Sequence, residues 1–118
     1  MGTLGELERA VMDAIWDSSG TVTAYDVQDV LQSQGRTLAA TTVLTVLARL
    51  EKKGFVVSDR SARPHRYSAL ASRADHTAEL MHEVLGGAGD RTAVLARFVG
   101  GVSAEDAAVL RRLLDSAA

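Results

Sequence analysis

The residues best suited to metal chemistry are His76, Glu79 and Glu83. Residues three or four positions apart share one face of a helix, so these three side chains could bind Zn²⁺ together. No further ligand is evident in the sequence, and histidine and glutamate are common on solvated helix faces. The chain also has no cysteine, which excludes thiolate metal sites and disulfide bonds. We therefore interpret the group as a solvated helix face and expect no metal and no cofactor.

The sequence shows no catalytic grouping of residues. An enzyme would need a nucleophile beside a base, two carboxylates placed for acid and base chemistry, or a metal cluster. Trp16 and Tyr67 could stack on nucleotide bases, but both lie beside apolar residues, which favours places in the hydrophobic core. We predict that the protein is not an enzyme.

Positive charge is concentrated in one segment, although the chain as a whole carries a net charge of −2. Between Arg36 and Arg66, only Glu51 and Asp59 are acidic, and the segment has a net charge of +5. From Ala71 onward the net charge is −2. A local positive field attracts polyanions whatever the net charge of the protein. The basic residues of the segment are Arg36, Arg49, Lys52, Lys53, Arg60, Arg63 and Arg66.

Three helices are expected between the beginning of the chain and the middle of the basic segment. Leu4, Leu7, Val11, Ala14 and Ile15 recur at helical spacing and predict the first. Thr23 and Asp26 have the spacing of a capping box, so a second helix should begin near Ala24 and end before Gly35. A third should run from about Ala40 to Lys53, with a buried stripe of Val43, Val46, Leu47 and Leu50. Its opposite face is almost uncharged and carries Thr41, Thr45, Ala48 and Lys52.

A hairpin should follow the third helix. Phe55–Ser58 and His65–Ser68 are typical of short strands, and the polar residues 59–64 between them form an arginine-bearing tip. Beyond the hairpin, three helical stretches are expected at about Arg73–Leu85, Arg91–Val99 and Ala104–Leu114. Their apolar ridges lie on helices too short to be stable alone, so they need a partner surface.

Three helices followed by a basic hairpin suit a winged helix-turn-helix, in which the third helix enters the major groove of DNA. We expect Thr41, Leu44 and Thr45 to contact base edges, because hydroxyls can bond to bases and methyl groups can pack on thymine. His65, on the hairpin, could contact phosphate or lie idle on the surface. The residues expected to contact phosphates are Thr42, Arg49, Lys52, Arg60, Arg63 and Arg66. Two alternatives remain: ordinary solvated charges on a small domain, or a winged helix that binds proteins.

The sequence resembles the penicillinase-repressor family, the group of BlaI, MecI and CopY. The similarity covers nearly the whole chain, and the third-helix motif with its Lys-Lys-Gly end is its most specific part. It is carried by Leu4–Asp13, Ile15-Trp16, Thr41–Gly54, Arg66-Tyr67 and Ala93–Val99. Some relatives carry basic residues where this chain has Thr41 and Leu44, so an operator sequence does not transfer.

The resemblance implies a mostly α fold with a small β-hairpin. Residues 1–71 would form a winged helix-turn-helix domain, and residues 72–118 a helical dimerisation region. The protein would then be a homodimer that binds a dyad-symmetric operator in double-stranded DNA and represses transcription. The residues expected to join the subunits are Leu80, Val84, Leu85, Leu95, Phe98, Val99, Leu110, Leu113 and Leu114.

The resemblance also implies a regulatory partner. Penicillinase repressors are cut by a signal-activated membrane protease just before a phenylalanine that resembles Phe98, so Arg97 and Phe98 mark a cleavage site. Arg97 stands where those repressors carry asparagine. Copper-sensing members carry cysteine pairs near the C-terminus, and this chain has no cysteine, which disfavours release by copper.

A cytoplasmic location is expected. No apolar run approaches the ~18 residues that cross a bilayer, so we expect no membrane insertion. The opening residues MGTLGELERAV lack the basic and then apolar pattern of a secretion signal.

Overall fold

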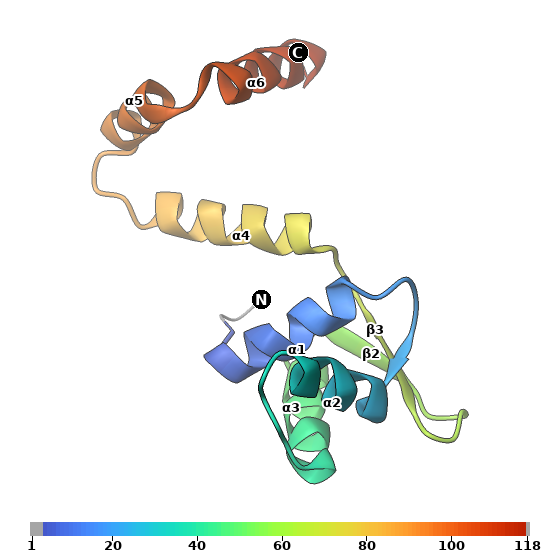
Figure 1. Ribbon diagram of the computed structural model, residues 1–118. Helices are drawn as coiled ribbons and strands as arrows, with labels where there is room; N and C mark the ends of the chain where they lie inside the picture. Colours follow the sequence, from blue (N-terminus) through green and yellow to red (C-terminus); the bar gives the residue numbers. More distant parts are fainter. Residues whose placement is uncertain (1–3, 118) are drawn as a thin grey trace. The chain divides into compact units, whose positions relative to one another are not determined.

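The computed structural model describes residues 4–117, in which six helices and three short strands are found (Figure 1). By internal contacts the chain divides into two units, the first extending to Ala78 and the second beginning at Glu79. The helices are α1 (Glu6–Trp16), α2 (Ala24–Ser33), α3 (Ala40–Lys52), α4 (Arg73–Gly86), α5 (Arg91–Gly101) and α6 (Ala104–Ala117). The strands are β1 (Val22–Thr23), β2 (Val56–Asp59) and β3 (Arg66–Ala69).

The first unit is built on α1, α2 and α3, which pack against one another around one hydrophobic core (Figure 1). Helices of 10 to 13 residues depend on such packing, because they are marginal in isolation. The predicted third helix is confirmed as α3, and so is its buried stripe. The fully buried core side chains include Met12, Leu31, Val43, Leu47 and Leu50.

The start of α2 is fixed by the capping box that the sequence predicts. Thr23 Oγ1 accepts a hydrogen bond of 3.1 Å from the Asp26 amide, and Asp26 Oδ2 accepts one of 2.9 Å from the Thr23 amide. Two amides at the helix end, which lack intrahelical partners, are thereby satisfied. Gly35 follows α2 with a φ of +88°, a conformation that glycine adopts without strain.

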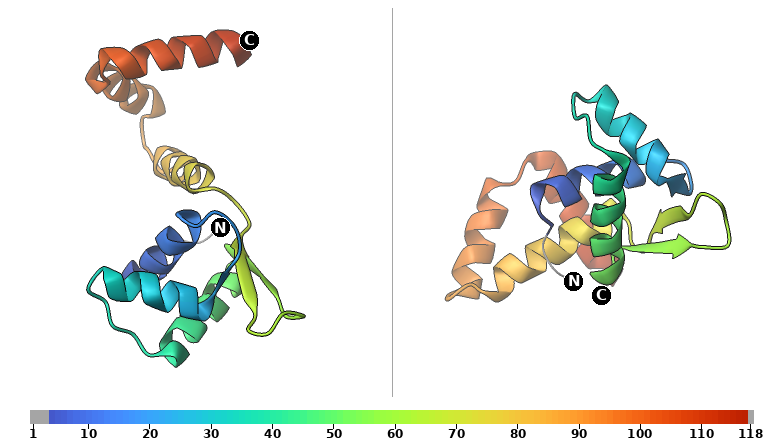
Figure 2. Two further views of the ribbon diagram at one scale, coloured as in Figure 1. Left: turned by 45° about the vertical axis from the view of Figure 1, so that its right-hand side comes forward. Right: turned by 90° about the horizontal axis from the view of Figure 1, so that it is seen from below.

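The strands form one antiparallel sheet in the order β1-β3-β2. In the hairpin, Val57 lies opposite Ser68 and Asp59 opposite Arg66. On the other side of β3, Val22 pairs with Tyr67. Gly54, with a φ of +85°, turns the chain from α3 into β2. The hairpin projects beyond the helices as a wing (Figure 2), so the first unit is a winged helix-turn-helix.

The sequence predictions for the hairpin need small corrections. Both strands begin one residue later than expected, at Val56 and Arg66. The sheet also has a third strand, β1, which the sequence analysis did not foresee. The predicted core positions of Trp16 and Tyr67 are confirmed, since Tyr67 is buried and Trp16 packs half-buried against the core.

A partly buried ion pair connects the beginning of α1 to the end of α3. Glu8 Oε1 accepts hydrogen bonds from Lys53 Nζ at 2.8 Å and from the Gly5 amide at 2.9 Å. The Glu8 side chain is 12% exposed, and the bond from Lys53 lowers the pKa of its carboxyl below the ordinary value. Folding therefore favours the ionised form of Glu8.

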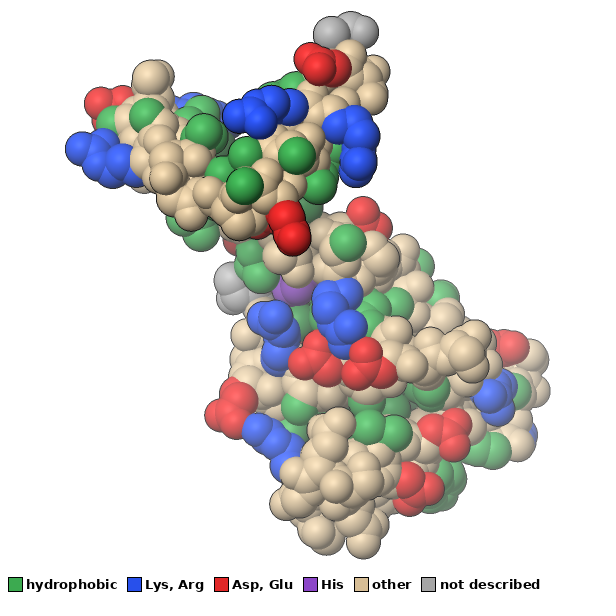
Figure 3. Space-filling view, turned by 45° about the horizontal axis from the view of Figure 1, so that its top comes forward, with side chains coloured by type: hydrophobic (Ala, Val, Ile, Leu, Met, Phe, Trp, Pro, Cys, Tyr) green, Lys and Arg blue, Asp and Glu red, His purple; other side chains and the backbone are tan. Residues whose placement is uncertain are grey.

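The second unit contains the rest of α4 with α5 and α6. The three predicted tail helices are confirmed, and each extends one to three residues further than expected. Neither α5 nor α6 contains a fully buried residue. Their apolar side chains are exposed or half-buried, as the space-filling view shows (Figure 3).

One expectation about burial is wrong. His76 was expected on a solvated helix face, but its side chain is only 3% exposed and packs near the rings of Trp16 and Phe55. Periodicity identifies a helix face, whereas the elements that cover the face are set by the rest of the fold.

Removing the cap of α2 should destabilise the first unit. We expect Thr23→Ala to lower the free energy of unfolding by about 1 kcal/mol, because the Asp26 amide loses its acceptor. Thr23→Ser keeps the hydroxyl and should retain most of that stability. Urea unfolding measures both, with Thr37→Ala, in an exposed loop, as the control. Equal losses in Thr23→Ala and Thr23→Ser would show that the methyl group matters rather than the cap.

The ion pair of Glu8 should give stability that disappears in acid. A carboxyl with a lowered pKa in the folded state stabilises the protein above its unfolded pKa, near 4.5, and this stabilisation is lost as the pH falls through the folded value. We expect Glu8→Gln to destabilise by about 1 kcal/mol at pH 7. The difference from the wild type should shrink below pH 4.5 in urea unfolding. Asp29→Asn, on the exposed surface of α2, is the control, and a difference that persists in acid would contradict the assignment.

Candidate nucleic-acid interface

The face of α3 opposite the core is open and nearly uncharged. Thr41, Thr45 and Ala48 are exposed on it, and Leu44 is 45% exposed. The buried stripe on the other side of the helix fixes the direction in which these side chains point. Small hydroxyl and methyl groups let a helix approach another surface closely. The face therefore has the form of a helix that reads base edges in a major groove.

One hydroxyl on this face is oriented by the helix itself. Thr45 Oγ1 donates a hydrogen bond of 2.9 Å to the backbone carbonyl oxygen of Thr41. A hydroxyl has a single proton, so in this arrangement Thr45 offers only acceptor lone pairs to a partner. Such a group complements the exocyclic amino groups of adenine or cytosine, and its methyl group complements the methyl of thymine.

The basic residues of α3 lie beyond this face. Arg49 and Lys52 are exposed in the last turns of α3. Arg49 interacts electrostatically with Glu8, and both exposed side chains are accessible to an anion. Thr42, expected to contact phosphate, is half-buried in the first turn. Lys53 is instead paired with Glu8.

The first arginine of the wing is bound by a carboxylate at the end of α3. Arg60 Nη2 lies 2.9 Å from Glu51 Oε1, and Ser58 Oγ donates a hydrogen bond of 2.6 Å to Glu51 Oε2. These two contacts lower the pKa of the Glu51 carboxyl, with the bond from Ser58 as the larger cause. The carboxylate therefore ties strand β2 to the end of α3 and partly neutralises Arg60.

The other two wing arginines also have local partners. Arg63 Nη1 lies 2.7 Å from His65 Nε2. Arg66 donates to Thr21 through Nε, at 2.6 Å to Oγ1, and through Nη2, at 3.0 Å to the carbonyl oxygen. Both arginines are exposed, and neither faces a carboxylate in these bonds. Among the described residues, neither forms an ion pair with a carboxylate, although Asp59 lies opposite Arg66 in the hairpin.

The arginines of the wing are evident from the sequence, but the residues that bind them are not. Glu51, Ser58 and Thr21 were not among the expected site residues. Glu51 was noted only as one of two acidic residues in the basic segment. A signal for Glu51 was present in the sequence. It is an acidic residue near the end of the third helix, and it is followed in the next strand and wing by a hydroxyl, Ser58, and an arginine, Arg60.

The residues expected to form a subunit contact lie on α4, α5 and α6. Leu80, Leu85 and Leu110 are half-buried. The others are exposed by 43% to 77%, and they are Val84, Leu95, Phe98, Val99, Leu113 and Leu114. Arg97, beside Phe98, is exposed within α5, and its guanidinium donates a weak bond of 3.4 Å to the Ala93 carbonyl oxygen.

The metal interpretation of His76, Glu79 and Glu83 finds no support. No three His, Asp or Glu side chains come together as metal ligands anywhere in residues 4–117. His76 is buried, whereas Glu83 is exposed. Among the described helices, none is long and apolar enough to cross a membrane.

Comparison with known proteins adds the family. A family model described as Penicillinase repressor matches residues 4–116. Two curated relatives, both called transcriptional regulator BlaI and from two strains of Mycobacterium tuberculosis, are each 45% identical to this chain over 87 residues. These residues make up 74% of the chain and 62% of each relative, so the match spans less than two thirds of the relatives' length. Because the family model matches the winged domain and all three C-terminal helices, the chain belongs to the penicillinase repressor family.

Proposed function

We propose that the protein is a sequence-specific DNA-binding repressor of transcription. The observation that carries the proposal is the exposed, uncharged face of α3, with Arg49 and Lys52 beyond it and the wing arginines on the neighbouring hairpin. A helix that only faced water would carry more charge. Base-reading groups flanked by phosphate-binding groups are the arrangement that specific recognition of double-stranded DNA requires.

Within this proposal, the contacts divide by chemistry. Thr41, Leu44 and Thr45 read bases, whereas phosphates are bound by Thr42, Arg49, Lys52, Arg60, Arg63 and Arg66. Arg60 must share or leave Glu51 to reach a phosphate, so it contributes less than Arg63, whose hydrogen-bond partner is the ring of His65 and not a carboxylate. The relatives called transcriptional regulators support this role. A binding protein of this kind carries out no catalysis, and we place it in the cytoplasm with the chromosome.

We further propose that two copies bind a dyad-symmetric operator. Residues 1–71 bind DNA and residues 72–118 join the copies through the apolar side chains of α4, α5 and α6. The absence of any fully buried residue from α5 and α6 supports a second copy as their cover. Two identical domains joined by a twofold axis match the symmetry of a palindromic site.

Relief of repression by a membrane protease requires the tail to unfold locally. The bond between Arg97 and Phe98 lies within α5, where the backbone is helical from Arg91 to Gly101. Proteases bind extended segments, so cleavage at this bond needs a local opening of α5. We propose that cleavage occurs there only when the apolar faces of the tail are uncovered.

Binding to DNA should be selective and strongly dependent on salt. We expect the protein to prefer DNA from its own promoter region over an unrelated duplex, with two copies per site. Affinity should fall steeply between 50 and 200 mM salt, by about a thousandfold if six phosphates are contacted. Electrophoretic mobility shifts across a salt series measure this. Equal and weak binding to both duplexes, with little response to salt, would favour a winged helix that binds proteins.

The two classes of contact should separate by mutation. Arg63→Gln should weaken binding to every sequence alike and reduce the slope of affinity against salt by about one. Thr45→Ala should lower affinity for the operator by about tenfold and leave binding to unrelated DNA unchanged. Arg9→Gln, which removes an exposed charge from α1, is the control. Equal effects of Arg63→Gln and Thr45→Ala on all sequences would contradict the division.

A further inference from the structure

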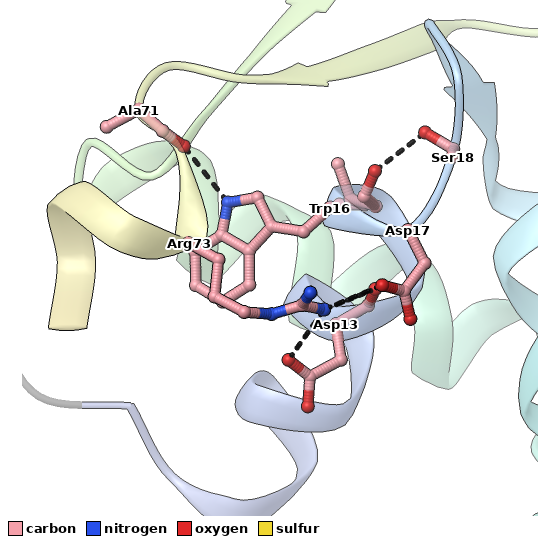
Figure 4. Close-up of polar contacts among 7 residues, drawn as sticks. Asp13, Trp16, Asp17, Ser18, Ala71 and Arg73 are labelled. Carbon is pink, nitrogen blue, oxygen red and sulfur yellow. Dashed lines mark hydrogen bonds and ion pairs between the residues drawn. The ribbon is translucent and has the colours of Figure 1, made fainter. Parts of the chain in front are cut away.

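The beginning of α4 is fastened to the end of α1 by one arginine. Arg73 Nη2 lies 2.9 Å from Asp17 Oδ1 and 3.3 Å from Asp13 Oδ1 (Figure 4). Its guanidinium carbon also lies 5.5 Å from the centre of the Trp16 ring, a cation–π contact. These contacts raise the pKa of Arg73, with the bond to Asp17 as the largest cause. Asp13 and Trp16 of α1, together with Asp17 directly after the helix, thus hold a single side chain of α4.

Two further contacts close the same junction. The Trp16 indole Nε1 donates a hydrogen bond of 3.0 Å to the carbonyl oxygen of Ala71, just before α4 (Figure 4). The His76 side chain is only 3% exposed. The centre of its ring lies 5.6 Å from the centre of the Trp16 ring and 5.3 Å from the centre of the Phe55 ring. Neither ring nitrogen of His76 has a hydrogen-bond partner within residues 4–117, so the ring is held by its packing against Trp16 and Phe55. Three kinds of contact therefore fix the beginning of α4, and the residues just before it, to α1 within the first unit.

We propose that Trp16, Arg73 and His76 form a latch that sets the distance between half-sites the repressor accepts. α4 begins in the first unit at Arg73 and continues as one helix into the second unit, which begins at Glu79. A latched helix transmits a fixed direction, whereas a loose one behaves as a tether. Trp16, Arg73 and His76 are positioning residues on this view, since none lies on the exposed face of α3. The inference rests on the proposed function of a dimer on a two-part operator.

The geometry of DNA makes such a latch measurable. Two extra base pairs between half-sites move one of them by about 7 Å and rotate it by about 70° around the duplex. A dimer whose two DNA-binding domains are fixed relative to each other then binds only one half-site. Its affinity for the operator falls by about a hundredfold, because the second domain no longer adds to binding. A dimer with tethered domains follows the displaced half-site and keeps most of its affinity.

The test uses Arg73→Glu in the full-length protein. The substitution places a carboxylate against Asp13 and Asp17, while glutamate in the first turn of α4 remains compatible with the helix. Arg9→Glu makes the same charge change at an exposed position of α1 and is the matched control. Trp16 is the one tryptophan in the chain, so its fluorescence reports directly on the latch. Emission should shift to longer wavelength in Arg73→Glu and return in the charge-swapped pair Arg73→Glu with Asp17→Arg.

Affinity is then measured on the operator found by footprinting the protein's own promoter DNA, on the same operator with two base pairs inserted, and on a single half-site. We expect the wild type and Arg9→Glu to lose about a hundredfold on insertion, and Arg73→Glu to lose less than about fivefold. Half-site affinity should match between Arg73→Glu and Arg9→Glu, which a general folding defect would not allow. The charge-swapped pair should regain part of the discrimination.

Two outcomes would overturn the latch. If the fluorescence of Arg73→Glu does not change, Arg73 does not hold the junction. If the fluorescence shifts and spacing discrimination stays as in the wild type, the junction does not set the spacing. Failure of the proposed function looks different, because the wild type would then show no selective operator at all.

Discussion

The packing of α3 through Val43, Leu47 and Leu50 is the constraint on which the rest of the structure depends. These side chains are completely buried against α1 and α2, so the helix cannot rotate without exposing them. The opposite face is left open, and the groups at its surface are determined by the same periodicity. Gly54 and the bond from Lys53 to Glu8 then end the helix and join that end to α1. The wing follows from this fixed point, because β2 begins two residues after Gly54.

The charges around α3 are organised by short local bonds rather than by free side chains. Arg60 meets a carboxylate, Arg63 an imidazole and Arg66 a threonine. Each bond restricts an otherwise flexible side chain, which reduces the conformational entropy that an anion would have to remove on binding. Of the three arginines, only Arg60 has a carboxylate as its bonding partner, so its positive charge is the most strongly neutralised. The three arginines therefore differ in the charge they offer to an anion, and a count of arginines in the sequence does not reveal this difference.

The features that depend on local pattern could be predicted from the sequence. The capping pair of Thr23 and Asp26 placed the start of α2 because both residues belong to one turn, and the stripe of α3 followed from helical spacing. The features that were missed join distant parts of the chain. β1 is only two residues long and exists because Val22 meets Tyr67. His76 is buried by Trp16 and Phe55, which no helical periodicity reveals. The arginines were identified by type, while Glu51 and Thr21 as their partners required the fold.

The bare faces of α5 and α6 have a consequence for how long the protein survives in a cell. Helices of 11 and 14 residues that bury no side chain completely gain little stability from their own chain. In the dimer that we propose, a copy without its partner would open these helices more often and would be degraded faster by housekeeping proteases. Newly made chains would persist only above the concentration at which they pair. Abundance of the protein would then respond to its rate of synthesis with a threshold rather than in proportion.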